Sequence, residues 1–181
     1  PARGGPARGG PFGGATTLAA RARRPLHPTA GRRRVTAHPR RLRFAVELKG
    51  PFPGLSWADS ARRLESLGYS TLMVPDHVGE GLGPLTAMAT AAAATTTLRV
   101  GSIVLACDFR HPAVVAHELA SLDVLSEGRV EVGLGAGWQR ADYDTTGVPM
   151  DEPRVRVDRL VEHVAVLRGL FGPGPFTFTG E

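Results

Sequence analysis

Residues 112–137 read PAVVAHELASLDVLSEGRVEVGLGAG, and this stretch decides the fold. Pro112 suits the first turn of a helix, and Gly128 supplies the left-handed residue that ends one. The apolar residues between them recur at helical spacing: Val115, Leu119, Leu122 and Leu125. Residues 129–134, which include Val130, Val132 and Leu134, then predict a strand that leads into a glycine-rich turn. A helix followed by a tight turn and a strand, repeated along the chain, indicates βα units around a parallel sheet.

The same alternation of strand and helix continues upstream and downstream of this stretch. Ser56 followed by Asp59 predicts a capped helix start, and Gly68 predicts the end of that helix. The predicted strands span residues 42–48, 71–74, 98–105 and 129–134. The predicted helices span residues 56–68, 84–95, 112–128 and 153–171. A last stretch, 176–179, alternates between Phe and Thr as a strand would. The chain therefore contains about four βα units.

These units favour a partial (β/α)8 TIM barrel of the α/β class over a doubly wound sheet. A doubly wound domain usually carries its phosphate-binding glycines in the first βα turn. Here that turn contains Pro51 and Pro53, and the glycine-rich turn follows the fourth strand instead. A complete barrel needs about 250 residues, of which residues 41–181 supply roughly half. We expect the N-terminal half of a barrel, truncated before it closes.

Residues 1–40 differ in composition from the rest of the chain. They contain nine Arg, no Asp or Glu, and 13 Gly or Pro. Because such a segment cannot bury enough apolar surface to fold, we expect a basic, disordered tail. A transit peptide and an RNA-binding arm are the alternatives, but the tail has no amphipathic helix period and only one aromatic residue, Phe12.

The body of the chain, residues 41–181, is mildly acidic. Subtracting the nine tail Arg from the 22 Lys and Arg leaves 13 basic residues against 17 acidic ones. This balance gives no reason to expect a nucleic-acid partner. No apolar run is long enough to suggest a membrane span. A single cysteine, Cys107, fits a reducing compartment, so we expect a cytoplasmic protein.

Polar residues gather where the predicted strands end, which is where barrel enzymes carry their reacting groups. Asp76 and His77 follow the second strand. Asp76 either orients the His77 imidazole for acid–base work or caps the loop beside a solvated histidine. Cys107 is expected to line the site without acting as a nucleophile. Arg110 either binds an anion or ties down its loop through carboxylates. No Cys/His cluster has the spacing of metal ligands.

Several short motifs in order resemble the luciferase-like monooxygenase superfamily, especially members that use the deazaflavin coenzyme F420. The resemblance covers residues 42–181. The motifs are Pro75-Asp76-His77, Leu98-Arg99-Val100-Gly101, Arg110-His111-Pro112, Leu122-Asp123-Val124-Leu125-Ser126-Glu127-Gly128-Arg129 and Gly133-Leu134-Gly135-Ala136-Gly137-Trp138. Each motif alone is weak, but their order and spacing together are specific.

The resemblance implies a (β/α)8 barrel with the cofactor ring across its mouth. It implies that Asp76 and His77 line the ring pocket and that residues 103–107 back the ring. The cofactor-binding residues implied are Asp76, Ile103, Val104, Ala106, Cys107, Gly135, Gly137 and Trp138. Relatives often have a cis peptide bond at the position of Ile103–Val104, and glycines like Gly135 and Gly137 let the backbone approach the ring. The phosphate-binding segments of the family lie in the second half of the barrel, outside this chain.

The function implied is hydride transfer to or from a small organic substrate through coenzyme F420, with His77 and Asp76 as the catalytic residues. Two alternatives stay open: an FMN-dependent monooxygenase of the same superfamily, and a catalytically inactive fragment. For the complete protein a homodimer is also expected, with neither nucleic acid nor a membrane as partner.

Overall fold

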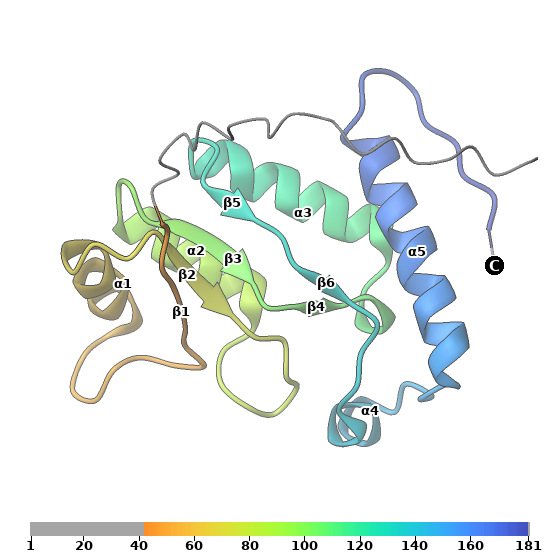
Figure 1. Cartoon of the computed structure of the whole chain (residues 1–181), viewed down its shortest axis with the longest axis horizontal. Helices are drawn as coiled ribbons and strands as arrows, with labels where there is room; N and C mark the ends of the chain where they lie inside the picture. The colour runs from red at the N-terminus through yellow and green to blue at the C-terminus, as the bar shows by residue number, and fades with distance from the viewer. Residues whose placement is uncertain (1–41, 181) are drawn as a thin grey trace, which may run out of the picture. The chain divides into compact units, whose positions relative to one another are not determined.

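The computed structural model describes residues 42–180, in which strands and helices alternate (Figure 1). The strands are β1 (Ala45–Glu47), β2 (Thr71–Val74), β3 (Arg99–Ser102), β4 (Leu105–Ala106), β5 (Val130–Glu131) and β6 (Leu134–Gly135). The helices are α1 (Trp57–Ser66), α2 (Pro84–Ala94), α3 (Pro112–Leu125), α4 (Arg140–Thr146) and α5 (Pro153–Leu170), with a 3-10 turn η1 (Cys107–Phe109). The predicted tail, residues 1–40, lies outside the described residues.

All strand pairs are parallel, and they follow the order of the chain. One sheet runs β1-β2-β3-β5, and β4 pairs with β6 beyond it. The helices contact one another in the same order, α1 with α2, α2 with α3 and α3 with α5. Figure 1 shows these four helices around the outside of the strands. The described residues therefore form four βα units arranged as in a (β/α)8 barrel, as predicted.

Two predicted strands are each interrupted once. The stretch 98–105 divides into β3 and β4 at Ile103–Val104, where the peptide bond is cis. The stretch 129–134 divides into β5 and β6 opposite that point. At the interruption the Ser102 hydroxyl hydrogen-bonds to the backbone of Gly133 on the neighbouring strand. It donates to the Gly133 carbonyl at 2.9 Å and accepts from the Gly133 N–H at 3.0 Å.

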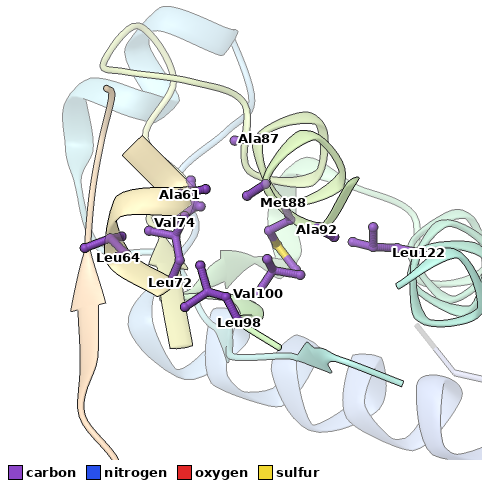
Figure 2. Packing of buried hydrophobic residues seen from close by; sticks show 11 residues of the cluster. Ala61, Leu64, Leu72, Val74, Ala87, Met88, Ala92, Leu98, Val100 and Leu122 are labelled. Carbon is purple, nitrogen blue, oxygen red and sulfur yellow. The ribbon is translucent and has the colours of Figure 1, made fainter. Parts of the chain in front are cut away.

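The main hydrophobic core lies between the sheet and helices α1 and α2 (Figure 2). Leu72, Val74 and Val100 project from the strands, and Leu64 and Met88 meet them from the helices. The Ala-rich sequence of α2 suits this position, since small side chains let a helix pack closely against both the sheet and α1. A second cluster joins α3 to α5 through residues that include Val115, Leu119 and Leu167.

Glu65, at the end of α1, holds the loop that enters β3. Its carboxylate accepts from the N–H groups of Thr96, Thr97 and Leu98 at 2.6–2.9 Å. Burial by itself would raise the pKa of Glu65, but the hydrogen bonds from Thr97 and Leu98 outweigh it and lower the pKa to about 2. Ser56 caps the other end of α1, as predicted, by accepting from the Asp59 N–H at 3.0 Å.

Two segments differ from the sequence prediction. Residues 140–146 were expected to lie in a loop, but they form helix α4, in which Asp142 and Tyr143 are buried. The segment has no apolar period that would have indicated a helix. The expected strand at 176–179 is wrong, since this segment has no strand conformation and Phe176 packs against Gly169 of α5 instead of pairing. Among residues 42–180, no helix is long and apolar enough to cross a membrane.

Candidate functional site

A cavity of about 290 Å³ opens at the carboxyl ends of β2, β4 and β6, the position of active sites in barrel enzymes. Eight of the nine residues predicted for the site line it: Asp76, His77, Ile103, Val104, Ala106, Gly135, Gly137 and Trp138. Four residues that were not predicted complete the lining: Phe109, Ala136, Asp142 and Tyr143. We call this cavity the strand-end pocket.

His77 is oriented by Asp142, a residue of α4. The His77 Nδ1 lies 2.9 Å from the Asp142 Oδ2, and the Val78 N–H donates to the Asp142 Oδ1 at 3.0 Å. Both side chains are shielded, with exposed fractions of 17% for His77 and 5% for Asp142. A carboxylate can only accept, so we assign the proton to Nδ1 of His77. The other ring nitrogen, Nε2, is then the atom with a free lone pair for proton transfer.

Asp76 does not orient His77, which was one of the two roles considered for it. Its carboxylate, 2% exposed, is held by the guanidinium of Arg110, which donates from Nη1 and, at 2.8 Å, from Nη2. The Ala106 N–H also donates to Asp76 at 3.0 Å. Asp76 thus joins the ends of β2 and β4 to the loop that carries Arg110. Of the two roles considered for Arg110, the structure shows the tie through a carboxylate.

The glycine-rich turn is required by contacts within the chain. A Cβ on Gly135 would meet Val104, and one on Gly137 would meet the hydroxyl of Tyr143. Gly137 also has a φ of +72°, which side chains other than glycine rarely adopt. Gly135 thus lets β6 pack against Val104, and Gly137 lets the following turn pack against Tyr143. Both glycines line the pocket.

Three apolar side chains form the exposed wall of the strand-end pocket. Ile103 and Val104 are 46% and 39% exposed, and Trp138 is 73% exposed. The rings of Trp138 and His77 meet edge to face, with centroids 5.9 Å apart. Large apolar side chains open to solvent at the mouth of a cavity are typical of a binding surface.

Cys107 is the one predicted site residue that lies elsewhere. It lines a neighbouring cavity on the other side of η1, together with Asp108. Burial and the negative charge of Asp108 raise the pKa of the Cys107 thiol to about 11. The thiol therefore stays protonated at neutral pH, in agreement with the view that it is no nucleophile.

Asp108 and Tyr143 form a buried support beneath the pocket. The Tyr143 hydroxyl donates to Asp108 at 2.7 Å, and Arg159 of α5 donates to the same carboxylate at 2.7 Å. Burial and the hydrogen bond to Asp108 raise the pKa of Tyr143 to about 12. Tyr143 thus stays neutral and fixes α4, which carries Asp142, against η1.

Sequence reasoning missed Asp142 and Tyr143 because α4 was assigned to a loop. Both lie within six residues of the glycine-rich turn, and Gly147 follows them with a φ of +74°, as is typical of a helix end. Gly147 was therefore a sequence signal that a short helix ends there. That helix places Asp142 and Tyr143 at the strand ends.

The strand-end pocket suits a flat, largely apolar ring. Its volume is near the lower end of the ~300–1,000 Å³ range of ligand sites. Apolar side chains supply its wall, and residues of the glycine-rich turn line it beside them. Among the described residues that line it, none is Lys or Arg. The pocket can accommodate the ring system of a flavin-type cofactor, whereas its lining offers no basic side chain for the phosphates.

Comparison with known proteins agrees with this geometry. The family model described as luciferase-like monooxygenase matches residues 49–181. The pyrimidine monooxygenase RutA of Enterobacter sp. (strain 638) is 38% identical over 142 residues, which cover 77% of this chain and 38% of the relative.

Two solved structures extend the comparison. An F420-dependent secondary alcohol dehydrogenase, solved with an F420–acetone adduct, is 27% identical with a TM-score of 0.63, over 76% of this chain and 44% of that one. The oxygenating constituent of 3,6-diketocamphane monooxygenase from Pseudomonas putida, solved with FMN, shares the fold at 21% identity with a TM-score of 0.66, over 77% of this chain and 42% of that one. The chain spans less than half the length of these relatives. The predicted fold class and family resemblance are confirmed.

Proposed function

Since the chain belongs to the luciferase-like monooxygenase family, we propose that it forms the ring-binding part of an oxidoreductase that uses coenzyme F420 to transfer hydride to or from a small organic substrate. The observation that carries this proposal is the strand-end pocket, in which the oriented His77 ring faces apolar walls. The 27% identical F420-dependent dehydrogenase supports the choice of cofactor.

The pocket residues divide into two roles. When bound, the cofactor ring supplies the hydride chemistry. Ile103, Val104 and Trp138 would hold the ring and exclude water from one face. His77 would accept the hydroxyl proton of an alcohol at Nε2 as its carbon loses hydride, and would return that proton in the reverse reaction.

Asp142 is then a positioning residue. It touches neither substrate nor ring in this scheme, but its hydrogen bond to Nδ1 fixes the tautomer that leaves Nε2 free as a base. In Asp142→Asn the new amide group can donate a hydrogen bond to Nδ1. This favours the tautomer of His77 that carries its proton on Nε2, which cannot act as a base there. Turnover should fall by about 10²-fold or more while cofactor affinity stays within about twofold.

A second candidate function is an FMN-dependent monooxygenase. It is favoured by two relatives named as monooxygenases, which are 38% and 34% identical to this chain. In that case the same pocket would hold the FMN ring, and His77 would face the oxygenated substrate.

Titration of the chain with F420 and, separately, with FMN distinguishes these functions. We expect fluorescence quenching of Trp138 to saturate with F420 at a concentration at least tenfold lower than with FMN. The reverse order would favour the monooxygenase, and saturation by neither ligand would contradict both. Replacing His77 by Gln should abolish turnover, while His117→Gln, on the exposed face of α3, is the matched control and should have no effect.

A further inference from the structure

A buried arginine lies behind the glycine-rich turn of the strand-end pocket. Arg156 belongs to the first turn of α5 and is 9% exposed. Charged side chains are seldom buried without a partner of opposite charge. Yet among residues 42–180 no carboxylate lies within ion-pair distance of the Arg156 guanidinium. It donates to three backbone carbonyls instead.

These carbonyls belong to the two ends of the segment that carries α4. The chain leaves β6 through Ala136 and Gly137, forms α4, and passes Asp151 before α5 begins (Figure 1). The Arg156 Nη1 donates to the Gly137 carbonyl and, at 3.3 Å, to the Ala136 carbonyl. Its Nε donates to the Asp151 carbonyl at 3.0 Å. Within the described part of the chain, no other side chain bonds to the backbone at both ends. We call residues 138–150 the α4 segment.

The α4 segment carries two residues that contact His77. The Asp142 Oδ2 lies 2.9 Å from the His77 Nδ1, and the Trp138 ring meets the His77 ring edge to face. Helix α4 has seven residues, which is too short for a helix that is stable by itself. Tyr143 ties the middle of the segment to Asp108, whereas Arg156 holds its two ends. The placement of Asp142 therefore depends on these contacts.

The chemistry of the guanidinium explains why an arginine occupies this position. Its planar group carries N–H donors that point in fixed and different directions, so it can bond carbonyls of two segments at once. The carbonyl dipoles also offset the cost of removing the charge from water. A lysine ammonium would keep the charge, but its short reach around a single nitrogen could not serve both ends.

We propose that Arg156 is a positioning residue for His77: by holding both ends of the α4 segment, it keeps Asp142 in hydrogen-bond contact with the His77 ring. This inference deepens the proposed function and rests on it for the role of His77 in proton transfer. The placement of Asp142 itself can be measured without a cofactor.

The first measurement is the NMR signal of the His77 ring N–H in the full chain without cofactor. Because this proton is bonded to the buried Asp142, we expect a low-field signal that exchanges slowly with water and is absent from His77→Gln. Arg156→Gln should raise its exchange rate about tenfold or more, while the backbone amides of β2 keep their protection. This difference separates a local release of the α4 segment from a general loss of stability.

Two further variants complete this measurement. Arg154→Gln is the matched control, since Arg154 lies on the same helix with a side chain that is 93% exposed, and it should leave the signal unchanged. Arg156→Lys should raise the exchange rate as Arg156→Gln does, because the ammonium cannot bond both ends. It also takes the place of Arg156→Gln if that variant fails to fold.

The second measurement is turnover, which shows whether this placement matters to the reaction. Arg156→Gln should lower turnover about tenfold or more, because a small misplacement of a reacting group is costly. If Arg156 acts through Asp142, it should add little once that contact is lost. The double variant should then turn over within about twofold of Asp142→Asn alone, whereas two independent effects would multiply.

The inference is overturned if the His77 ring N–H exchanges as in the parent in either Arg156 variant. It is also overturned if the β2 amides lose protection to the same extent, or if the turnover losses of Arg156→Gln and Asp142→Asn multiply. Faster exchange in a chain that shows no turnover with F420 would support the role of Arg156 and contradict the proposed function alone.

Discussion

Arg110→Ala should destabilise the chain although Arg110 does not line the strand-end pocket. The replacement leaves the Asp76 carboxylate, 2% exposed, without its guanidinium partner. Removing one member of a buried ion pair costs about 3–5 kcal/mol. Two features reduce that cost here: the Ala106 N–H still donates to Asp76, and the 25% exposure of Arg110 lets water in after truncation. We therefore expect a loss of about 2–3 kcal/mol in the free energy of unfolding.

Urea unfolding of the wild-type and variant chains measures this loss. Arg110→Lys is the control for charge, since it keeps a cation but not the two-pronged geometry, and should recover about half of the stability. Combining Arg110→Ala with Asp76→Asn should cost less than the sum of the single changes by about 1 kcal/mol or more. A loss below about 0.5 kcal/mol for Arg110→Ala, or strict additivity in the double variant, would show that the pair behaves as an exposed surface ion pair and refute the reasoning.

Three further predictions concern single residues. Glu65 has a folded-state pKa of about 2, below its ordinary value of 4.5, so its stabilising effect is complete above about pH 4.5 and is lost as the pH falls toward 2. Glu65→Gln should therefore flatten the acid limb of stability plotted against pH, and an unchanged limb would contradict this. Cys107, with a pKa of about 11, should react with Ellman's reagent at pH 8 roughly 100-fold more slowly than free cysteine until urea unfolds the chain. Gly137→Ala should lower the melting temperature more than Gly147→Ala, because both glycines have a φ near +70° but only the first would also collide with Tyr143. Equal shifts would mean that the collision is relieved.

The order of elements followed from the sequence because the signals involved are local. Strand β2 spans residues 71–74, as the apolar run indicated, and α3 begins at Pro112 as expected. Helix caps and apolar periodicity act over a few residues and need no tertiary partner. The residues of the strand-end pocket could be named in the same way, since parallel strands place their carboxyl ends, and thus Asp76, His77 and Gly135, at one edge.

The pairing of side chains required the tertiary structure. Asp76 and His77 are neighbours in the sequence, yet they turn to different partners: Asp76 to Arg110, which is 34 positions away, and His77 to Asp142, which is 65 positions away. No local pattern encodes such contacts, because the carboxylate chosen depends on which loop the barrel brings to the strand end. The separation of Cys107 from the pocket has the same cause, since the η1 turn directs its side chain to the opposite side. The amino-acid sequence by itself determined the fold and the edge of the sheet that carries the site, whereas long-range packing decided which residue orients the histidine.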